Sequence, residues 1–317
     1  MNTPLLSVCL ITYNHENYIL QAIEGVLMQE VDFEWELIIA DDCSTDRTRE
    51  IVLEYKSKYP DFIKLILQEK NVGPAKNWMD LLATPQSKYI AYFEGDDYWT
   101  DPLKLQKQVD FLDNNNEYVL CFHPVDILKT SGIVTEDFIT EVPKNHEAIE
   151  DLALLGNYIH TPSVVFRNII KQFPVEFMLS PIGDFFLYML LAESGRFKYL
   201  EEKMSVYREG VGIWSSRSAY LKDFNTAYTH ALLVSTSKFS DMITNILLSR
   251  IALFLEAYGN QIDFEKLCLL NTCPKVNTLI YTSLLKEREN IRLETINMKT
   301  SKQLLTELLK RGKKRLW

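Results

Sequence analysis

The chain of 317 residues is 47% hydrophobic and 24% charged, a composition typical of a folded globular protein. The formal net charge of −9 argues against a nucleic-acid-binding protein, because such proteins gain affinity from cationic contacts with phosphates. The five cysteines form neither a CxxC pair nor a cluster with histidine, which predicts reduced thiols without a disulfide framework or a zinc site. With no secretory signal pattern and no apolar run of about 18 residues, we expect a cytoplasmic protein.

The first 125 residues alternate between short β-branched or aromatic runs and amphipathic segments. We expect strands at 5–13, 35–40, 62–67, 88–93 and 118–122, and helices at 16–29, 46–58, 75–83 and 102–114. Strands that alternate with helices predict βαβ units. The fold class is therefore α/β, with a mostly parallel central sheet flanked by helices.

The rest of the chain changes in pattern at about residue 218. From 126 to 217 it is mixed, with short strands at 163–166 and 197–200 around one strongly apolar helix that begins at Gly183. From 218 to 317 it is helical throughout. No low-complexity linker separates these parts, so we expect a C-terminal all-helical extension that packs on the first unit.

Acidic and polar side chains collect at the ends of three predicted strands, in residues 12–16, 41–46 and 94–97. Ligands bind at the carboxyl ends of the strands in an open α/β sheet, so these segments are expected to meet there. Neighbouring carboxylates repel one another, and a divalent cation would neutralise them. Mg²⁺ and Mn²⁺ take one or two carboxylates together with water and substrate phosphates. We predict that Asp96 and Asp97 bind a metal that carries a diphosphate; the alternative is a polar turn that caps a helix.

Four segments occur in an order and at spacings that resemble one known family. They are 7–29 (SVCLITYNHENYILQAIEGVLMQ), 36–52 (ELIIADDCSTDRTREIV), 71–77 (NVGPAKN) and 89–105 (YIAYFEGDDYWTDPLKL). Together they resemble the nucleotide-sugar-binding half of a family 2 glycosyltransferase with the Rossmann-like GT-A fold. The resemblance is close over residues 5–125 and looser over 126–215.

The resemblance implies a division of labour along the chain. Residues 1–125 would be the nucleotide-sugar-binding half, and 126–217 the acceptor-binding and catalytic half of the same GT-A domain. Residues 218–317 would be a helical C-terminal extension.

The resemblance also assigns roles within the matched motifs. It implies that Tyr13 packs near the nucleobase, that Asp42 accepts a hydrogen bond from the base, and that Lys76 contacts base or diphosphate. The structural alternatives are edge packing, a turn and a solvated helix position, respectively. The metal ligands would be Asp97, which carries most weight, and Asp96. The expected donor-binding residues are Thr12, Tyr13, Asn14, Asp42, Asn71, Lys76, Asp96, Arg208 and Trp214.

Inverting sugar transfer also needs a base, because the acceptor hydroxyl loses a proton as it attacks the anomeric carbon. The resemblance points to Asp184, which follows Gly183 at a helix start, as this catalytic carboxylate. The alternative is an aspartate that caps the helix. His160 and Ser163 fall on the strand that lies on the acceptor side in this family.

The segment 207–217 resembles the loop that closes over the donor diphosphate in the family. Arg208 and Trp214 are its candidate donor-binding residues, and a surface ion pair is the alternative for Arg208. Some relatives carry a metal-binding histidine in this loop, whereas this chain has no histidine within 161–229. The metal would then rest mainly on Asp97, the diphosphate and water, which leaves strict metal dependence open.

The resemblance implies an inverting hexosyltransferase that moves a sugar from a nucleoside diphosphate donor, expected to be a UDP-sugar, to a glycan or lipid-linked glycan. Mn²⁺ or Mg²⁺ would be the cofactor, and bacterial cell-envelope polysaccharide assembly the pathway. A phosphatase of the haloacid dehalogenase type would need an aspartate where the first strand ends in Thr12-Tyr13-Asn14, and a dehydrogenase would need GxGxxG there. A non-catalytic nucleotide-sugar-binding protein stays open as the alternative.

The last twenty residues carry seven Lys or Arg against one Glu, with leucines at helical spacing. A basic amphipathic segment of this kind, at 299–317, can lie on the inner face of the cytoplasmic membrane as a peripheral contact. A solvated helix is the other interpretation of the same pattern.

Overall fold

The computed structural model describes residues 3–137, 146–212, 214–258 and 289. Within them, seven strands form the main sheet in the order β10-β6-β9-β4-β1-β2-β3. These strands are β1 (Leu6–Thr12), β2 (Trp35–Asp41), β3 (Ile63–Leu67), β4 (Tyr89–Glu94), β6 (Tyr118–Phe122), β9 (Val165–Arg167) and β10 (Arg196–Tyr199). All neighbours pair in parallel except β9, which runs antiparallel to β4 and β6. The predicted fold class, an α/β protein with a mostly parallel sheet, is confirmed.

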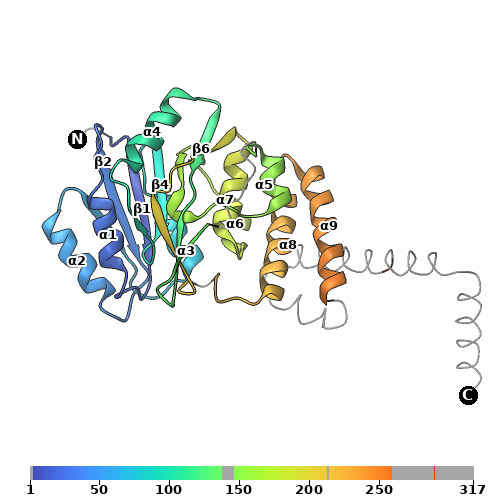
Figure 1. The fold of residues 1–317 in the computed structure, drawn as a ribbon, viewed down its shortest axis with the longest axis horizontal. Helices are drawn as coiled ribbons and strands as arrows, with labels where there is room; N and C mark the ends of the chain where they lie inside the picture. The colour runs from blue at the N-terminus through green and yellow to red at the C-terminus, as the bar shows by residue number, and fades with distance from the viewer. Residues whose placement is uncertain (1–2, 138–145, 213, 259–288, 290–317) are drawn as a thin grey trace, which may run out of the picture.

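Helices cover both faces of this sheet (Figure 1). One face carries α1 (Ile19–Leu27), α2 (Thr48–Lys58) and α4 (Lys104–Asn114), and the other carries α3 (Pro74–Leu82), α6 (Val175–Leu179) and α7 (Gly183–Ala192). The strands read as continuous apolar runs because successive side chains enter opposite cores. In β1, for example, Val8 and Leu10 belong to the core under α1, whereas Cys9 belongs to the core under α3.

A second, smaller sheet was not anticipated from the sequence. Its strands follow the order β5-β11-β7-β8 and are β5 (Tyr98–Trp99), β7 (Asp126–Lys129), β8 (Val134–Glu136) and β11 (Ser205–Glu209). β11 pairs antiparallel with β5, with Val206 opposite Tyr98. β5 has only two residues, so no periodicity marks it in the sequence. The pairing brings residues 205–209 beside the acidic turn 94–97, more than a hundred positions earlier in the chain.

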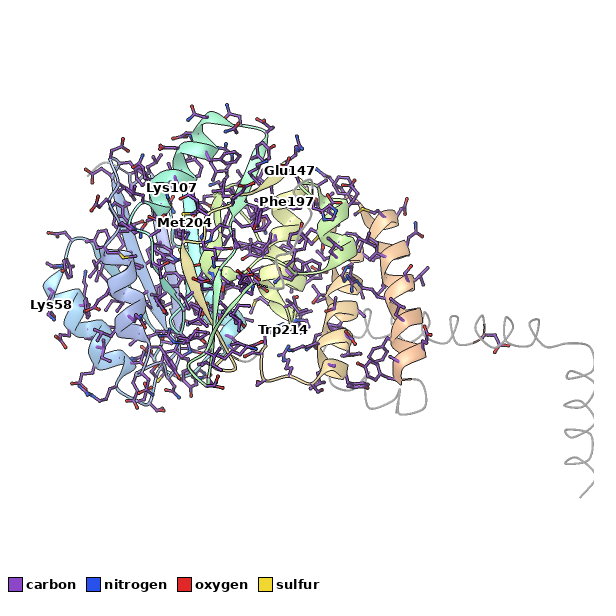
Figure 2. All side chains as sticks on the ribbon, viewed as in Figure 1. Lys58, Lys107, Glu147, Phe197, Met204 and Trp214 are labelled. Carbon is purple, nitrogen blue, oxygen red and sulfur yellow. The ribbon has the colours of Figure 1, made fainter. Side chains whose placement is uncertain are left out.

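A third layer of helices packs outside the second face of the sheet. It consists of α5 (Ile149–Leu155), α8 (Ala219–Thr236) and α9 (Ser240–Tyr258), and side chains such as the buried Phe197 fill the space beneath it (Figure 2). This confirms a helical part at the C-terminal end. No described helix has both the length and the apolarity needed to cross a membrane. The expected membrane contact at 299–317 lies outside the described residues.

Candidate active site

The register of the central strands brings their polar ends to one edge of the sheet. Thr12, at the end of β1, pairs with Asp41 of β2, and Ile11 pairs with Glu94 of β4. A cavity of about 660 Å³ opens at this edge. Its size falls within the ordinary range for small-molecule sites, and its position is the expected one for an α/β sheet.

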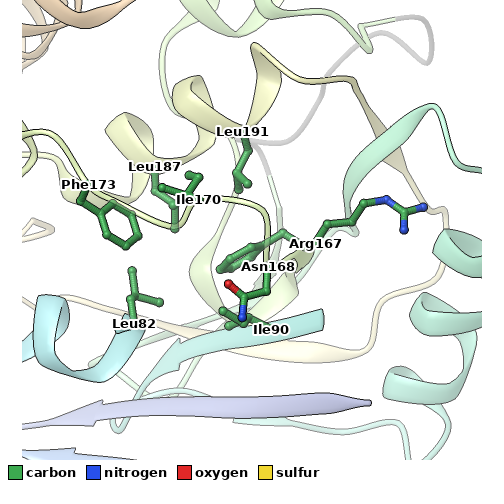
Figure 3. Close-up of a pocket in the computed structure, with 9 residues that line it drawn as sticks. Leu82, Ile90, Arg167, Asn168, Ile170, Phe173, Leu187 and Leu191 are labelled. Carbon is green, nitrogen blue, oxygen red and sulfur yellow. The ribbon is translucent and has the colours of Figure 1, made fainter. Parts of the chain in front are cut away.

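The cavity brings together most of the residues that the sequence singled out. Those that line it are Thr12, Tyr13, Asn14, Asp42, Asn71, Asp96, His160, Asp184 and Trp214. Lys76, Asp97, Ser163 and Arg208 are not among the described lining residues. A second pocket, between β9, α3 and α7, has a volume of only about 10 Å³, which is room for about one water molecule (Figure 3).

Three carboxylates define the deep part of the cavity. Glu94 and Asp96 come from the end of β4, and Asp184 comes from the start of α7. Loss of solvation, reinforced by the charges of Asp96 and Asp184, raises the pKa of Glu94 to about 8. Burial likewise raises the pKa of Asp184. Within the described ranges, none of these three forms an ion pair with lysine or arginine. This part of the cavity is therefore acidic, and its three carboxyl groups have no lysine or arginine ion-pair partner among the described residues.

Two buried oxygens at this site fit a hard cation. Asp96 Oδ1 and Asp97 Oδ2 have no hydrogen-bond partner among the described residues. Burial and the charge of Asp96 raise the pKa of Asp97 well above its usual range, and its Oδ1 accepts a hydrogen bond from Arg208 N at 2.9 Å. The described side chains do not form a group of three or more ligands that could enclose a metal alone. Such a donor set suits Mg²⁺ or Mn²⁺ completed by water and phosphate.

Asp184 is held from two sides at the start of α7. Its Oδ2 accepts a hydrogen bond from Asn157 Nδ2 at 2.6 Å, and its Oδ1 accepts one from Phe185 N at 2.9 Å. The N-cap position of α7 is Ile182, and no side chain caps the helix there. Asp184 is therefore the second residue of α7 and not its N-cap, and its side chain lines the cavity.

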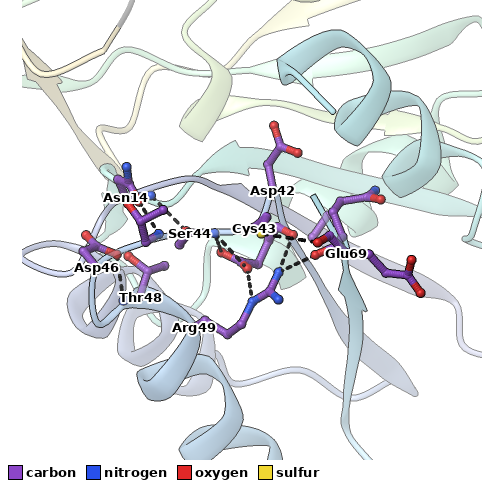
Figure 4. A network of polar contacts seen from close by, with 12 residues as sticks. Asn14, Asp42, Cys43, Ser44, Asp46, Thr48, Arg49 and Glu69 are labelled. Atoms are coloured by element: carbon purple, nitrogen blue, oxygen red, sulfur yellow. Dashed lines mark hydrogen bonds and ion pairs between the residues drawn. The ribbon is translucent and has the colours of Figure 1, made fainter. Parts of the chain in front are cut away.

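The other end of the cavity is built from the loops after β1, β2 and β3. Asp42 accepts hydrogen bonds from Val72 N at 2.7 Å and Gly73 N at 3.0 Å, which ties the start of α3 to β2. Figure 4 shows its carboxylate pointing away from the network around Arg49. Gly73 has φ 86°, a conformation that glycine adopts without strain. Tyr13 is 41% exposed beside this loop, so its ring is available to a ligand.

The residues outside the lining have structural partners. Lys76 pairs with Asp80 one turn further along α3. Ser163 is fully buried and donates from Oγ to the carbonyl oxygen of His160 at 2.7 Å. His160 in turn approaches Asp137 Oδ1 with Nε2 at 3.2 Å, so its ring is fixed where it lines the cavity.

The side chain of Arg208 contacts the backbone of the acidic turn 94–97. Its Nη1 donates to the carbonyl oxygen of Asp96 at 2.6 Å, and its guanidinium lies 5.0 Å from the ring of Tyr18 and 4.7 Å from the ring of Tyr98. Its second amino group donates to Gln21. These contacts differ from the surface ion pair that was the alternative in the sequence, because the arginine side chain joins α1, β5 and the turn.

Sequence reasoning gave no role to several polar residues that line the cavity. Glu94 lies in the quoted acidic motif, and Tyr207 and Arg217 lie in the quoted segment 207–217, but none of the three received a role; Asn157 lies in no quoted motif. Arg217 is the notable one, since burial lowers its pKa and its Nη1 donates to Pro181 O at 3.3 Å. No described carboxylate pairs with it. It brings a positive charge to a predominantly acidic cavity.

Comparison with known sequences bears on this site. The family model described as glycosyl transferase family 2 matches residues 7–173, which include the ends of β1, β2 and β4. An uncharacterised protein of Mycobacterium tuberculosis is 37% identical over 239 residues, which cover 75% of this chain and 68% of that protein. The putative glycosyltransferase EpsE of Bacillus subtilis is 34% identical over 232 residues, covering 73% of this chain and 81% of EpsE.

Solved structures share the architecture. S. aureus TarS in complex with UDP has a TM-score of 0.60 at 19% identity, over 90% of this chain and 89% of that one. The mannosyltransferase PcManGT of Pyrobaculum calidifontis, in complex with GDP-Man and Mn²⁺, has a TM-score of 0.54 at 15% identity, over 100% and 88% of the two chains. At these identities the likeness concerns the fold. The family match across more than half the chain, the relatives and the strand-end motifs together show that the chain belongs to glycosyl transferase family 2.

Proposed function

We propose that this protein is an inverting glycosyltransferase that moves a sugar from a nucleoside diphosphate donor to a hydroxyl of a glycan or lipid-linked glycan. One observation carries the proposal: Asp184, the candidate base, and Asp96, the candidate metal ligand, line the same cavity as Asp42 and Tyr13, the candidate nucleotide contacts. A donor held by its nucleotide at one end would therefore present its sugar near Asp184.

Asp184 would take the proton of the attacking acceptor hydroxyl. The hydrogen bond from Asn157 favours the ionised carboxylate and fixes its direction. Burial acts the other way and raises its pKa, which makes it a stronger proton acceptor once ionised. His160, held against Asp137, lies on the same cavity wall and would contact the acceptor.

Asp96 is the first candidate for a metal ligand and Asp97 the second. From the sequence alone, Asp97 was the preferred metal ligand. We reverse that preference because Asp96 lines the cavity, whereas one carboxylate oxygen of Asp97 already accepts a hydrogen bond from Arg208 N. A bound Mn²⁺ or Mg²⁺ would offset the negative charge that develops on the leaving diphosphate. Arg217, which also lines the cavity, would add a second positive charge.

The donor and the setting complete the proposal. TarS has been solved with UDP, which supports a UDP-sugar as donor. PcManGT has been solved with GDP-Man, so the test also includes a GDP-sugar as the alternative donor. The family resemblance supports three further parts of the proposal. They are transfer of a hexosyl group, a cell-envelope polysaccharide as product, and a cytoplasmic location with residues 299–317 as a peripheral membrane contact.

The test has two stages. The purified protein is first melted with UDP, GDP, dTDP or CDP, each with and without Mn²⁺; a nucleotide at about 100 times its Kd should add roughly 2.7 kcal/mol of stability. Release of the same nucleotide from its sugar conjugates is then measured for wild type and Asp184→Asn. We expect the variant to bind the nucleotide and to lose about 10²–10⁴-fold in turnover. Equal turnover in both proteins would contradict the role of Asp184.

A non-catalytic nucleotide-sugar-binding protein is the second candidate. It is favoured only if the wild type binds one nucleotide with Mn²⁺ and releases none from any sugar conjugate, with glycan and lipid-linked acceptors present. The close hydrogen bond between Asn157 and the cavity-facing Asp184 argues for catalysis, because binding alone requires no oriented carboxylate there.

A further inference from the structure

The residue before the candidate base packs directly on an indole ring. A methyl group built on Gly183 would lie 2.3 Å from Trp78 Cζ3 and 2.9 Å from Cε3, far inside van der Waals contact. The backbone of Gly183 is not left-handed. Glycine is therefore required at this position for space, since the backbone of α7 begins in contact with the ring face of Trp78.

Trp78 itself packs against two aromatic rings and also lines the cavity. Only 6% of its surface is exposed, and its ring centroid lies 5.0 Å from that of Tyr92 on β4 and 4.9 Å from that of Phe177 on α6. Its Nε1 has no hydrogen-bond partner among the described residues, so packing alone fixes the ring. Interiors packed in this way pass displacements on instead of absorbing them.

The helix that carries Trp78 is anchored at the nucleotide end of the cavity. The backbone just before α3 donates two hydrogen bonds to Asp42, from Val72 and Gly73. The neighbour of Trp78 in the chain, Asn77, donates from Nδ2 to Ala40 O on β2 at 3.1 Å. The short helix α3 thus contacts the sheet beside the nucleotide site at its start, and Gly183, the residue before the candidate base, further along.

We propose that Trp78 is a positioning residue, which sets the place of Asp184 relative to the bound donor through its contact with Gly183. This inference rests on the proposed function, in which Asp184 is the base. Trp78 need not touch the reacting atoms. Its effect is geometric, because a base displaced by about 1 Å can lose about 10²-fold in rate although substrate still binds.

The proposal is tested by one substitution that introduces a steric clash with Trp78 and a second that removes it. Gly183→Ala introduces the methyl group, and Trp78→Phe removes the outer ring atoms that would meet it while it keeps an aromatic ring against Tyr92 and Phe177. We expect Gly183→Ala to lower kcat by about 10²-fold and to leave the Kd of UDP with Mn²⁺ within about threefold. The double variant should recover at least about tenfold of that loss, since contacting residues are not additive.

The pH profile separates positioning from a merely structural role. The acidic limb of kcat/KM reports the pKa of the base in the free enzyme. If α7 shifts, Asp184 changes its burial and its bond to Asn157, so the limb should move in Gly183→Ala and return in the double variant. A loss of folded protein would lower the amplitude at every pH without moving the limb. Phe173→Leu, which loosens the neighbouring Phe177 without touching Gly183, is the matched control and should leave the limb in place.

The outcomes distinguish this inference from the proposed function. If the wild type turns over a donor and Asp184→Asn does not, but Gly183→Ala matches the wild type, the inference is overturned and the proposed function stands. The same holds if Gly183→Ala is impaired and Trp78→Phe gives no recovery. If the wild type turns over no donor at all, the proposed function fails and the inference fails with it. Melting curves of all variants confirm that folded proteins are compared.

Discussion

Asn157 Nδ2 donates a hydrogen bond of 2.6 Å to Asp184 Oδ2, joining the loop after α5 to the start of α7 at the deep wall of the cavity. The two residues are 27 positions apart, and no motif links them. A hydrogen bond to the ionised carboxylate lowers its pKa, opposing the burial that raises it. The amide therefore favours the ionised form of Asp184 and fixes the direction of its carboxylate.

The first prediction concerns this amide. Asn157→Ala should raise the pKa of Asp184 further, because burial remains and the stabilising hydrogen bond is gone. The acidic limb of kcat/KM should move to higher pH, and kcat should fall by about tenfold or more. Asn168→Ala is the control, since Asn168 bonds only to backbone carbonyls away from the cavity. An unshifted limb in Asn157→Ala would show that Asn157 does not tune the base.

The second prediction ranks the two metal-ligand candidates. Asp96→Asn should abolish the Mn²⁺-dependent part of nucleotide binding, because Asp96 lines the cavity with a free buried oxygen. Asp97→Asn should weaken it less, since its Oδ1 can still accept from Arg208 N. Melting with UDP, with Mn²⁺ or with EDTA, measures both. The reverse order of effects would return Asp97 to the first place.

The third prediction concerns the buried Lys104, whose Nζ donates to Gln108 Oε1 at 2.6 Å and lies 4.5 Å from the ring of Trp99. Burial lowers the pKa of Lys104 to about 7. Between that value and the usual 10.5, the unfolded chain binds the proton that the folded protein lacks, so stability rises with pH across this range and is lost again as pH falls from about 10.5 to about 7.

Denaturant unfolding at several pH values measures this effect. From pH 7 to 10 the free energy of unfolding of the wild type should gain up to about 4 kcal/mol relative to Lys104→Met, which has no titratable amine. Methionine keeps much of the side-chain volume and serves as the matched comparison. Parallel pH dependence of the two proteins would mean that the amine keeps its ordinary pKa in the folded state.

The fourth prediction concerns Arg208, which contacts the acidic turn 94–97. Arg208→Lys should reduce Mn²⁺-dependent UDP binding and cost about 1–3 kcal/mol of stability, because the single nitrogen of lysine lacks the planar fork with which Arg208 bonds Asp96 O and Gln21 and contacts the rings of Tyr18 and Tyr98. Arg47→Ala, which removes an exposed ion pair with Glu50, should leave stability close to that of the wild type. Equal and small effects in both variants would contradict a bracing role for Arg208.

Local sequence patterns predicted many of the helices and strands of the fold. The strands at 35–40 and 88–93 appear as β2 and β4, and the predicted helix at 46–58 appears as α2. The helix expected from residue 16 begins at Ile19, because Tyr18 N and Ile19 N both bond to His15 O and form a turn first. Boundaries of this kind depend on loop hydrogen bonds that residue periodicity does not record.

Several site residues were beyond reach of the sequence. Asn157 lies in no motif and Arg217 received no role within the segment 207–217; both enter the cavity only because α5, α7 and the loop before α8 fold back onto the sheet edge. The proposed order of Asp96 and Asp97 as metal ligands could likewise not be read from the sequence, since adjacent aspartates in one motif look alike. Their difference comes from β11, which offers a backbone N–H to one and not to the other.

The sequence by itself determined the α/β class, the strand ends that carry function and the family, because apolar runs, turn residues and motif spacing are local properties of the chain. The tertiary structure alone decided which carboxylates share one cavity, which of them keep unpartnered oxygens, and that Gly183 rests on Trp78. The physical reason is that burial, charge coupling and steric contact depend on neighbours in space. Those neighbours come from segments a hundred residues apart that only the folded sheet brings together.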